Sequence, residues 1–136
     1  MTESASPPIT VLVVDDDKSI CEIYSEVLTS RGYRVVSAYS CKQAMEQMDA
    51  INGEAQVLVV DFGLPDGDGS DFVRDSSAKY GGRNTLFVSG WTDEFWQLDD
   101  APGRWLIMRK PVPIPKLFAA VDWLARGGPK PAELEL

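Results

Sequence analysis

The sequence predicts an α/β domain in which a parallel β-sheet is covered by helices on both faces. Short aliphatic runs alternate with segments of helical periodicity, and the loops that join them are short. The aliphatic runs are nearly continuous, as expected for strands buried on both sides. At 136 residues the chain is long enough for one domain with a substantial core.

Strands are expected at Thr10–Val14, Arg34–Tyr39, Val57–Val60, Thr85–Val88 and Trp105–Met108. The first helix is expected to open with the capping-box pattern Ser19-x-x-Glu22 and to stop at Gly32. The second opens with Ser40-x-x-Gln43 and ends at Asn52-Gly53. A short helix follows the loop Gly63–Gly69, a brief one covers about Thr92–Leu98, and the last begins near Pro115.

Composition excludes several functions. The net charge of -8 disfavours a nucleic-acid surface, which needs clustered Lys and Arg. The absence of histidine excludes Ser-His-Asp triads and His-ligated metals. Cys21 and Cys41 are not spaced as a zinc or redox motif. With no apolar run that could cross a bilayer and no apolar signal region near the start, we expect a cytoplasmic protein without membrane contact.

Polar residues follow four of the expected strands, at the point where each strand ends. They are Asp15–Asp17, Asp61, Ser89 and Lys110. Ligand sites of such sheets lie beyond the carboxyl ends of the strands, so these side chains should converge. Carboxylates without His or Cys suit a hard cation, most plausibly Mg²⁺. Such a cluster, with Lys and Ser nearby, can hold a phosphoryl group, and one aspartate can attack phosphorus to give an acyl phosphate.

Four segments in order, VLVVDDD, VLVVDFGLPDGDG, TLFVSG and RKP, resemble the receiver domain of bacterial two-component response regulators. The resemblance implies a flavodoxin-like fold with strand order 2-1-3-4-5. It implies Asp61 as the phosphoacceptor, and Asp15, Asp16, Asp61 and the backbone carbonyl of Gly63 as Mg²⁺ ligands. Ser89 would be the switch hydroxyl and Lys110 the cation that pairs with phosphate. It also implies a cis Lys110–Pro111 bond.

The resemblance covers residues 9–126, which we assign to the receiver domain. Residues 1–8 are expected to be a flexible N-terminal segment, and residues 127–136 a C-terminal tail or truncated linker. Asp17 is interpreted as charge at the start of the first helix. Asp66 and Asp68 are interpreted as turn formers, with contact to the ion through water as the alternative.

Two positions depart from the family pattern. Ile107 stands where relatives usually carry Tyr or Phe, and Trp105 should lie on the same side of its strand. Trp105 either packs there or substitutes for the missing ring. Trp91 either shields the acyl phosphate or packs on the fourth helix. These departures bear on the conformational output more than on phosphorylation.

The predicted function is a phosphoacceptor switch in a phosphorelay. A partner histidine kinase or phosphotransfer protein would supply the phosphoryl group to Asp61. A downstream protein would read the face of the fourth helix, fifth strand and fifth helix, and a homodimer is also possible. Catalysis would be limited to self-phosphorylation and self-dephosphorylation. Two alternatives stand: a receiver-like binding module that is never phosphorylated, and a haloacid-dehalogenase-type phosphatase that uses Asp15.

Overall fold

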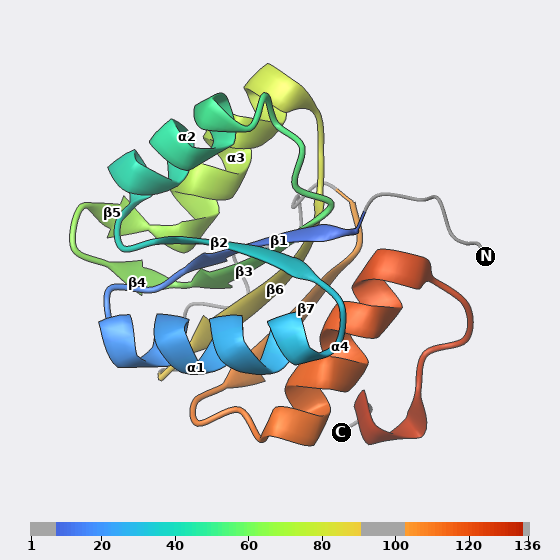
Figure 1. Ribbon diagram of the computed structural model, residues 1–136. Helices are drawn as coiled ribbons and strands as arrows, with labels where there is room; N and C mark the ends of the chain where they lie inside the picture. Colours follow the sequence, from blue (N-terminus) through green and yellow to red (C-terminus); the bar gives the residue numbers. More distant parts are fainter. Residues whose placement is uncertain (1–7, 91–102, 135–136) are drawn as a thin grey trace.

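The computed structural model describes residues 8–90 and 103–134. Its centre is a parallel five-stranded sheet in the order β2-β1-β3-β6-β7 (Figure 1). The strands are β1 (Thr10–Val14), β2 (Arg34–Ala38), β3 (Val57–Asp61), β6 (Asn84–Ser89) and β7 (Trp105–Arg109). When only the five strands of this sheet are numbered in chain order, the order is 2-1-3-4-5. The predicted fold class and strand order are therefore confirmed.

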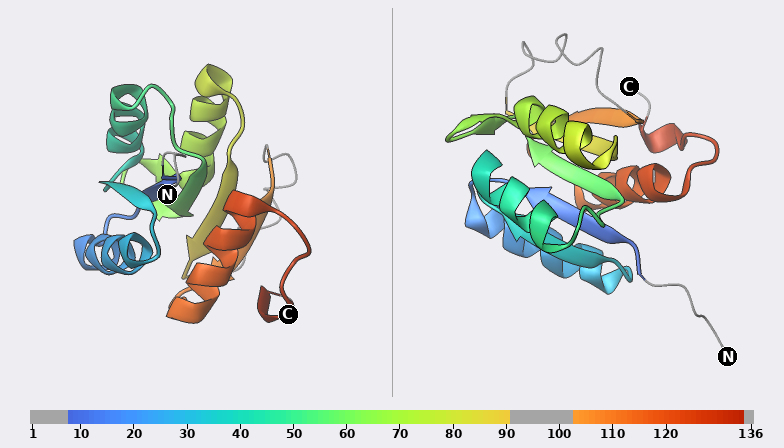
Figure 2. Two further views of the ribbon diagram at one scale, coloured as in Figure 1. Left: turned by 45° about the vertical axis from the view of Figure 1, so that its right-hand side comes forward. Right: turned by 90° about the horizontal axis from the view of Figure 1, so that it is seen from above.

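Within residues 8–90 and 103–134, helices cover both faces of the sheet (Figures 1 and 2). α1 (Lys18–Ser30) and α4 (Ile114–Arg126) cover one face, and α2 (Cys41–Ala50) and α3 (Gly69–Tyr80) cover the other. Alternate residues of β1 supply the two cores. Val11 and Val13 pack in the α1–α4 core, whereas Leu12 and Val14 pack in the α2–α3 core. Burial on both faces explains why β1 is aliphatic from Val11 to Val14.

The predicted start of the first helix is wrong. Helix α1 begins at Lys18, and its N-cap is Asp17, whose Oδ1 accepts hydrogen bonds from the amides of Ser19 at 2.9 Å and Ile20 at 3.4 Å. A carboxylate is a strong N-cap acceptor and also favours the positive end of the helix dipole. Cys21, in the first turn of α1, is buried in the α1–α4 core.

The loop after β3 is a small hairpin. β4 (Gly63–Leu64) pairs in antiparallel fashion with β5 (Gly67–Asp68), which leaves Pro65 and Asp66 at the turn. Helix α3 then starts at Gly69. The helix expected at about Thr92–Leu98 lies outside the described residues.

Past α4, the chain folds back on this helix. The Nε1 of Trp123 donates a hydrogen bond of 3.1 Å to the carbonyl of Gly128. A short 3-10 helix, Ala132–Leu134, follows. Leu134 has 7% of its surface exposed and packs in the α1–α4 core. Residues 127–134 therefore form part of the packed structure. Among the described helices, none has the length and apolar character needed to cross a membrane.

Candidate functional site

The carboxyl ends of four strands bring the predicted site residues to one edge of the sheet. Asp15 directly follows β1, Asp61 ends β3, Ser89 ends β6 and Lys110 directly follows β7. The strand register aligns these ends, with Val14 opposite Val60, Asp61 opposite Val88 and Ser89 opposite Arg109. Residues that are far apart in sequence therefore meet because the strands are parallel and end together.

Three carboxylates form the centre of this edge. Oxygens of Asp15, Asp16 and Asp61 lie within 4.8 Å of one another. Asp15 and Asp61 are buried, with 3% and 8% of their surface exposed, whereas Asp16 is exposed. A pair of such charges at 4 Å repel by roughly 4 kcal/mol at an effective dielectric of 20. This arrangement therefore requires a cation to offset the repulsion.

Lys110 supplies one such cation. Its Nζ lies 2.8 Å from Oδ2 of Asp15 and 3.0 Å from Oδ2 of Asp61. Burial alone would lower the pKa of Lys110, but its hydrogen bonds to the two carboxylates outweigh burial and raise that pKa. Lys110 is consequently charged across the physiological pH range. The Lys110–Pro111 peptide bond is cis, as the resemblance implied.

Asp61 has a perturbed pKa. Burial raises the pKa of this carboxyl, and the negative charge of Asp15 raises it further, while the hydrogen bond from Lys110 opposes both. The other Asp61 oxygen, Oδ1, accepts a hydrogen bond of 3.2 Å from the amide of Gly63. Both carboxylate oxygens are thus held by donors, which fixes the side chain at the edge of the sheet.

The remaining predicted residues lie beside this cluster. Ser89 is buried, with 2% of its surface exposed, and its carbonyl accepts a hydrogen bond of 2.9 Å from the amide of Lys110. Gly63 is exposed at the start of the hairpin. Their roles as switch hydroxyl and carbonyl ligand remain predictions.

The donor set fits a hard divalent cation. Three carboxylates converge, and the exposed Asp16 leaves a side open to water, which suits an ion that keeps part of its hydration. Cys21 lies close by, and its Sγ donates to the carbonyl of Asp15 at 3.3 Å. Burial and the charge of Asp15 raise the pKa of this thiol to about 11. It stays protonated and is not suited to binding a metal.

The structure gives two other predicted residues clear roles. The Asp66 carboxylate accepts hydrogen bonds from the amides of Cys41 at 2.8 Å and Lys42 at 3.0 Å, at the start of α2. The sequence pattern suggested only a turn former, because the partner amides lie 24 and 25 residues earlier. Trp105 and Ile107 both pack against the α2–α3 core, which confirms that they share one side of β7. Trp91 lies outside the described residues.

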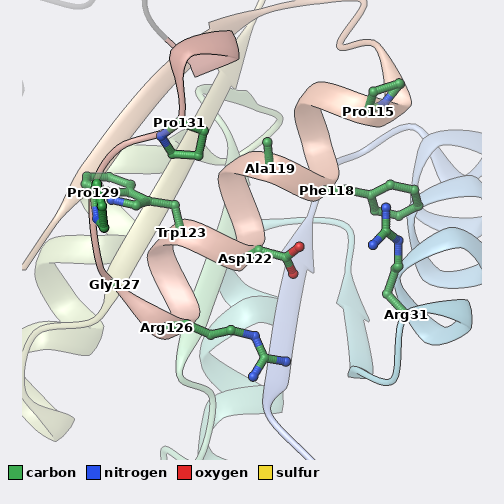
Figure 3. Close-up of a pocket in the computed structure, with 10 residues that line it drawn as sticks. All are labelled: Arg31, Pro115, Phe118, Ala119, Asp122, Trp123, Arg126, Gly127, Pro129 and Pro131. Carbon is green, nitrogen blue, oxygen red and sulfur yellow. The ribbon is translucent and has the colours of Figure 1, made fainter.

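A separate groove of about 570 Å³ runs along the side of α4 that faces away from the sheet (Figure 3). The guanidinium of Arg31 lies 4.0 Å from the ring centre of Phe118, and Asp122 accepts a hydrogen bond from the hydroxyl of Tyr33. The groove also contacts the returning segment at Pro129 and Pro131. Its lining residues include no member of the carboxylate cluster.

Comparison with known proteins agrees with the site. The family model described as the response regulator receiver domain matches residues 11–122. The chain belongs to this family, and its pocket of Asp15, Asp16 and Asp61 is typical of a phosphoacceptor site.

Among curated proteins, the chain is 31% identical over 113 residues to the sensor kinase CckA of Brucella abortus. The aligned region covers 82% of this chain and 12% of that protein. It is 34% identical over 65 residues to the KDP operon transcriptional regulatory protein KdpE of Escherichia coli, covering 48% and 28%. The chain thus spans only a small part of these relatives.

Solved structures confirm the fold. A response regulator receiver protein from Sinorhizobium medicae has a TM-score of 0.76 at 23% identity, covering 87% of this chain and 94% of that one. CheY in a complex with CheX, BeF3 and Mg from Borrelia burgdorferi has a TM-score of 0.72 at 18% identity, covering 84% and 87%. At these identities the likeness establishes the fold alone.

Proposed function

We propose that this domain accepts a phosphoryl group on Asp61 in a Mg²⁺-dependent reaction and thereby changes a surface that a partner protein binds. The observation that carries the proposal is the position of Lys110, whose ammonium group bridges Asp15 and Asp61 within a cluster of three carboxylates. A lysine and a cluster of this kind can neutralise the charge of a phosphoryl group and orient it toward one carboxylate.

Asp15, Asp16, Asp61 and the carbonyl of Gly63 would hold the ion. When bound, Mg²⁺ neutralises negative charge on the phosphoryl oxygens. The likeness to the CheY complex with CheX, BeF3 and Mg supports this choice of metal.

The transfer itself uses Asp61 as the nucleophile. A carboxylate oxygen of Asp61 forms a bond to phosphorus, and the P–N bond of the partner's phosphohistidine breaks. The electron pair goes to the departing imidazole. Lys110 remains protonated and pairs with the new phosphoryl group, and Ser89 donates a hydrogen bond to it. No histidine base is needed, because the transfer depends mainly on positioning and charge neutralisation.

The partner of the reaction follows from the family. Receiver domains imply a histidine kinase partner, and a phosphotransfer protein would serve by the same chemistry. We propose that output passes through the face that includes β7 and α4, because Lys110 joins the end of β7 to the site. A shift in the equilibrium between two arrangements of this face would then be read by a target protein or a second copy.

The test is to incubate the protein with acetyl phosphate and Mg²⁺ and to compare intact masses of the wild type and Asp61→Asn. We expect a gain of one phosphoryl group that needs donor, metal and Asp61. Absence of this gain, when a control receiver is labelled in parallel, would overturn the proposal. Peptide mapping of the label distinguishes the alternative enzyme class: a phosphoryl group on Asp15 would favour the phosphatase.

A further inference from the structure

The tip of the β4–β5 hairpin is hydrogen-bonded to the start of helix α2. Asp66, at the turn of the hairpin, accepts hydrogen bonds through Oδ1 from the Cys41 amide and through Oδ2 from the Lys42 amide. These are the first two residues of α2. The carboxylate is fully engaged by two backbone donors that belong to a different element.

These contacts complete the hydrogen bonding at the start of α2. The first amides of any helix lack partners within the helix. At α2, Ser40 Oγ accepts from the amide of Gln43 at 3.1 Å, and the amide of Ala44 reaches the carbonyl of Ser40 at 2.9 Å. Asp66 takes the two amides that remain. The helix therefore has two caps, one local and one supplied by the hairpin.

The base of the same hairpin is fixed at the candidate site. The chain leaves β3 at Asp61 and returns at Gly69, whose amide donates to the carbonyl of Phe62 at 2.8 Å. A Cβ atom at Gly69 would lie 2.3 Å from the carbonyl oxygen of Asp61, so the first residue of α3 passes directly against the end of β3. Between these points, Gly63 lies at the beginning of β4 and opposite Asp68 in β5.

A second contact joins the hairpin to α2. The Sγ of Cys41 lies 3.5 Å from the carbonyl of Asp68, the residue paired with Gly63. The hydrogen bonds from the amides of Cys41 and Lys42 lower the pKa of Asp66, so this anchor is ionised at neutral pH. The hairpin is consequently held at its base by the sheet and at its tip by the helix.

We infer that Asp66 is a positioning residue for the metal site. By anchoring the hairpin to α2, it holds Gly63, whose amide donates to Oδ1 of Asp61 at 3.2 Å, where its carbonyl can serve as a ligand. This inference rests on the proposed function, which makes that carbonyl a ligand. A hairpin with only four ladder residues has little stability of its own, so an anchor at the tip determines where its first strand lies.

The anchor is tested first without metal. Amide hydrogen exchange, followed by NMR, should show that Cys41 and Lys42 lose protection in Asp66→Ala and keep part of it in Asp66→Asn, which retains an acceptor oxygen. Gln43 should be unaffected, since its partner is Ser40. The matched control is Ser40→Ala, which removes the local cap of the same helix and should expose Gln43 instead.

The effect on the site is then measured by a Mg²⁺ titration that follows the amide signals of Asp16 and Gly63. Asp66→Ala should raise the Mg²⁺ dissociation constant roughly three- to tenfold, the range expected from losing a cap-sized interaction. Asp66→Asn should recover part of that affinity. Ser40→Ala should leave the dissociation constant at the wild-type value, even though it destabilises α2.

The outcomes separate the inference from the function on which it rests. If Asp66→Ala frees the two amides but binds Mg²⁺ as tightly as the wild type, the inference is wrong and the function stands. If Ser40→Ala weakens Mg²⁺ binding as much as Asp66→Ala, the effect is general destabilisation, and the inference is again wrong. A wild type that neither binds Mg²⁺ nor gains a phosphoryl group would overturn both.

Discussion

Lys110 and Asp61 lie 49 residues apart in the sequence, and 3.0 Å separates Nζ of the lysine from Oδ2 of the aspartate. The same ammonium lies 2.8 Å from Asp15. One cation thus serves two buried carboxylates, and a third carboxylate, that of Asp16, lies beside them. The stability of this edge and its chemistry both depend on that balance of charge.

Replacing Lys110 with Met should lower the free energy of unfolding by on the order of 3 kcal/mol at pH 7 without Mg²⁺, because two buried carboxylates lose their cation. Urea denaturation measures this change, and added Mg²⁺ should recover part of it. The control is Lys79→Met, which removes an exposed pair with Asp49 (side chains 54% and 46% exposed). That variant should lose less than about 1 kcal/mol. Equal losses in the two variants would contradict the charge balance described above.

Asp61→Asn should make the metal-free domain more stable at pH 7. Because burial raises the pKa of Asp61 in the fold, ionisation of this carboxyl opposes folding. The stability that the protonated carboxyl contributes at low pH is therefore lost as the pH rises through the raised pKa. The gain in melting temperature should therefore be present at pH 7 and disappear below the ordinary aspartate pKa of about 4. Thermal denaturation at several pH values measures it. A variant less stable than the wild type at pH 7 would contradict the direction of the shift.

Gly69→Ala should destabilise the domain by about 2 kcal/mol or more, because the new Cβ would lie 2.3 Å from the backbone oxygen of Asp61. It should also weaken Mg²⁺ binding. The matched variant is Gly63→Ala, whose Cβ would meet no described atom within 4 Å. It should keep the wild-type stability and its carbonyl, and thus bind Mg²⁺. Calorimetry and the Mg²⁺ titration give both readouts. Similar losses of stability at the two positions would argue against close contact at Gly69.

Leu134→Ala should cost about 2 kcal/mol, since Leu134 is 7% exposed and packs in the α1–α4 core. The result tests the prediction that residues 127–136 are a tail or linker, which would tolerate the change. Ile23→Ala, at a site 49% exposed, should change stability by less than about 0.5 kcal/mol. If Leu134→Ala has an equally small effect, the returning segment does not stabilise the domain.

Asp17→Ala should cost about 1 kcal/mol through loss of the N-cap of α1, whereas Ser19→Ala should stay within about 0.5 kcal/mol. Urea denaturation of the two variants shows whether Asp17 or Ser19 caps the start of α1. A larger effect at Ser19 would favour the capping box that the sequence pattern predicted.

The sequence by itself determined the sheet and the residues of the carboxylate cluster, and its resemblance to the receiver family implied the strand order. Aliphatic runs without alternation, and the polar residues that follow them, are local patterns that can be seen in the sequence. Parallel pairing of the strands then brings Asp15, Asp61 and Lys110 to one edge of the sheet.

Only the tertiary structure decided which carboxylate has which partner. Asp17 and Asp66 both lie in loops that follow a strand, yet one caps its own helix and the other caps α2, whose first two residues lie 25 and 24 residues earlier. Leu134 likewise joins the core only because the chain folds back on α4. Hydrogen bonds and packing between distant elements depend on where the completed sheet places those elements. The local sequence around a residue does not specify which distant element will lie beside it.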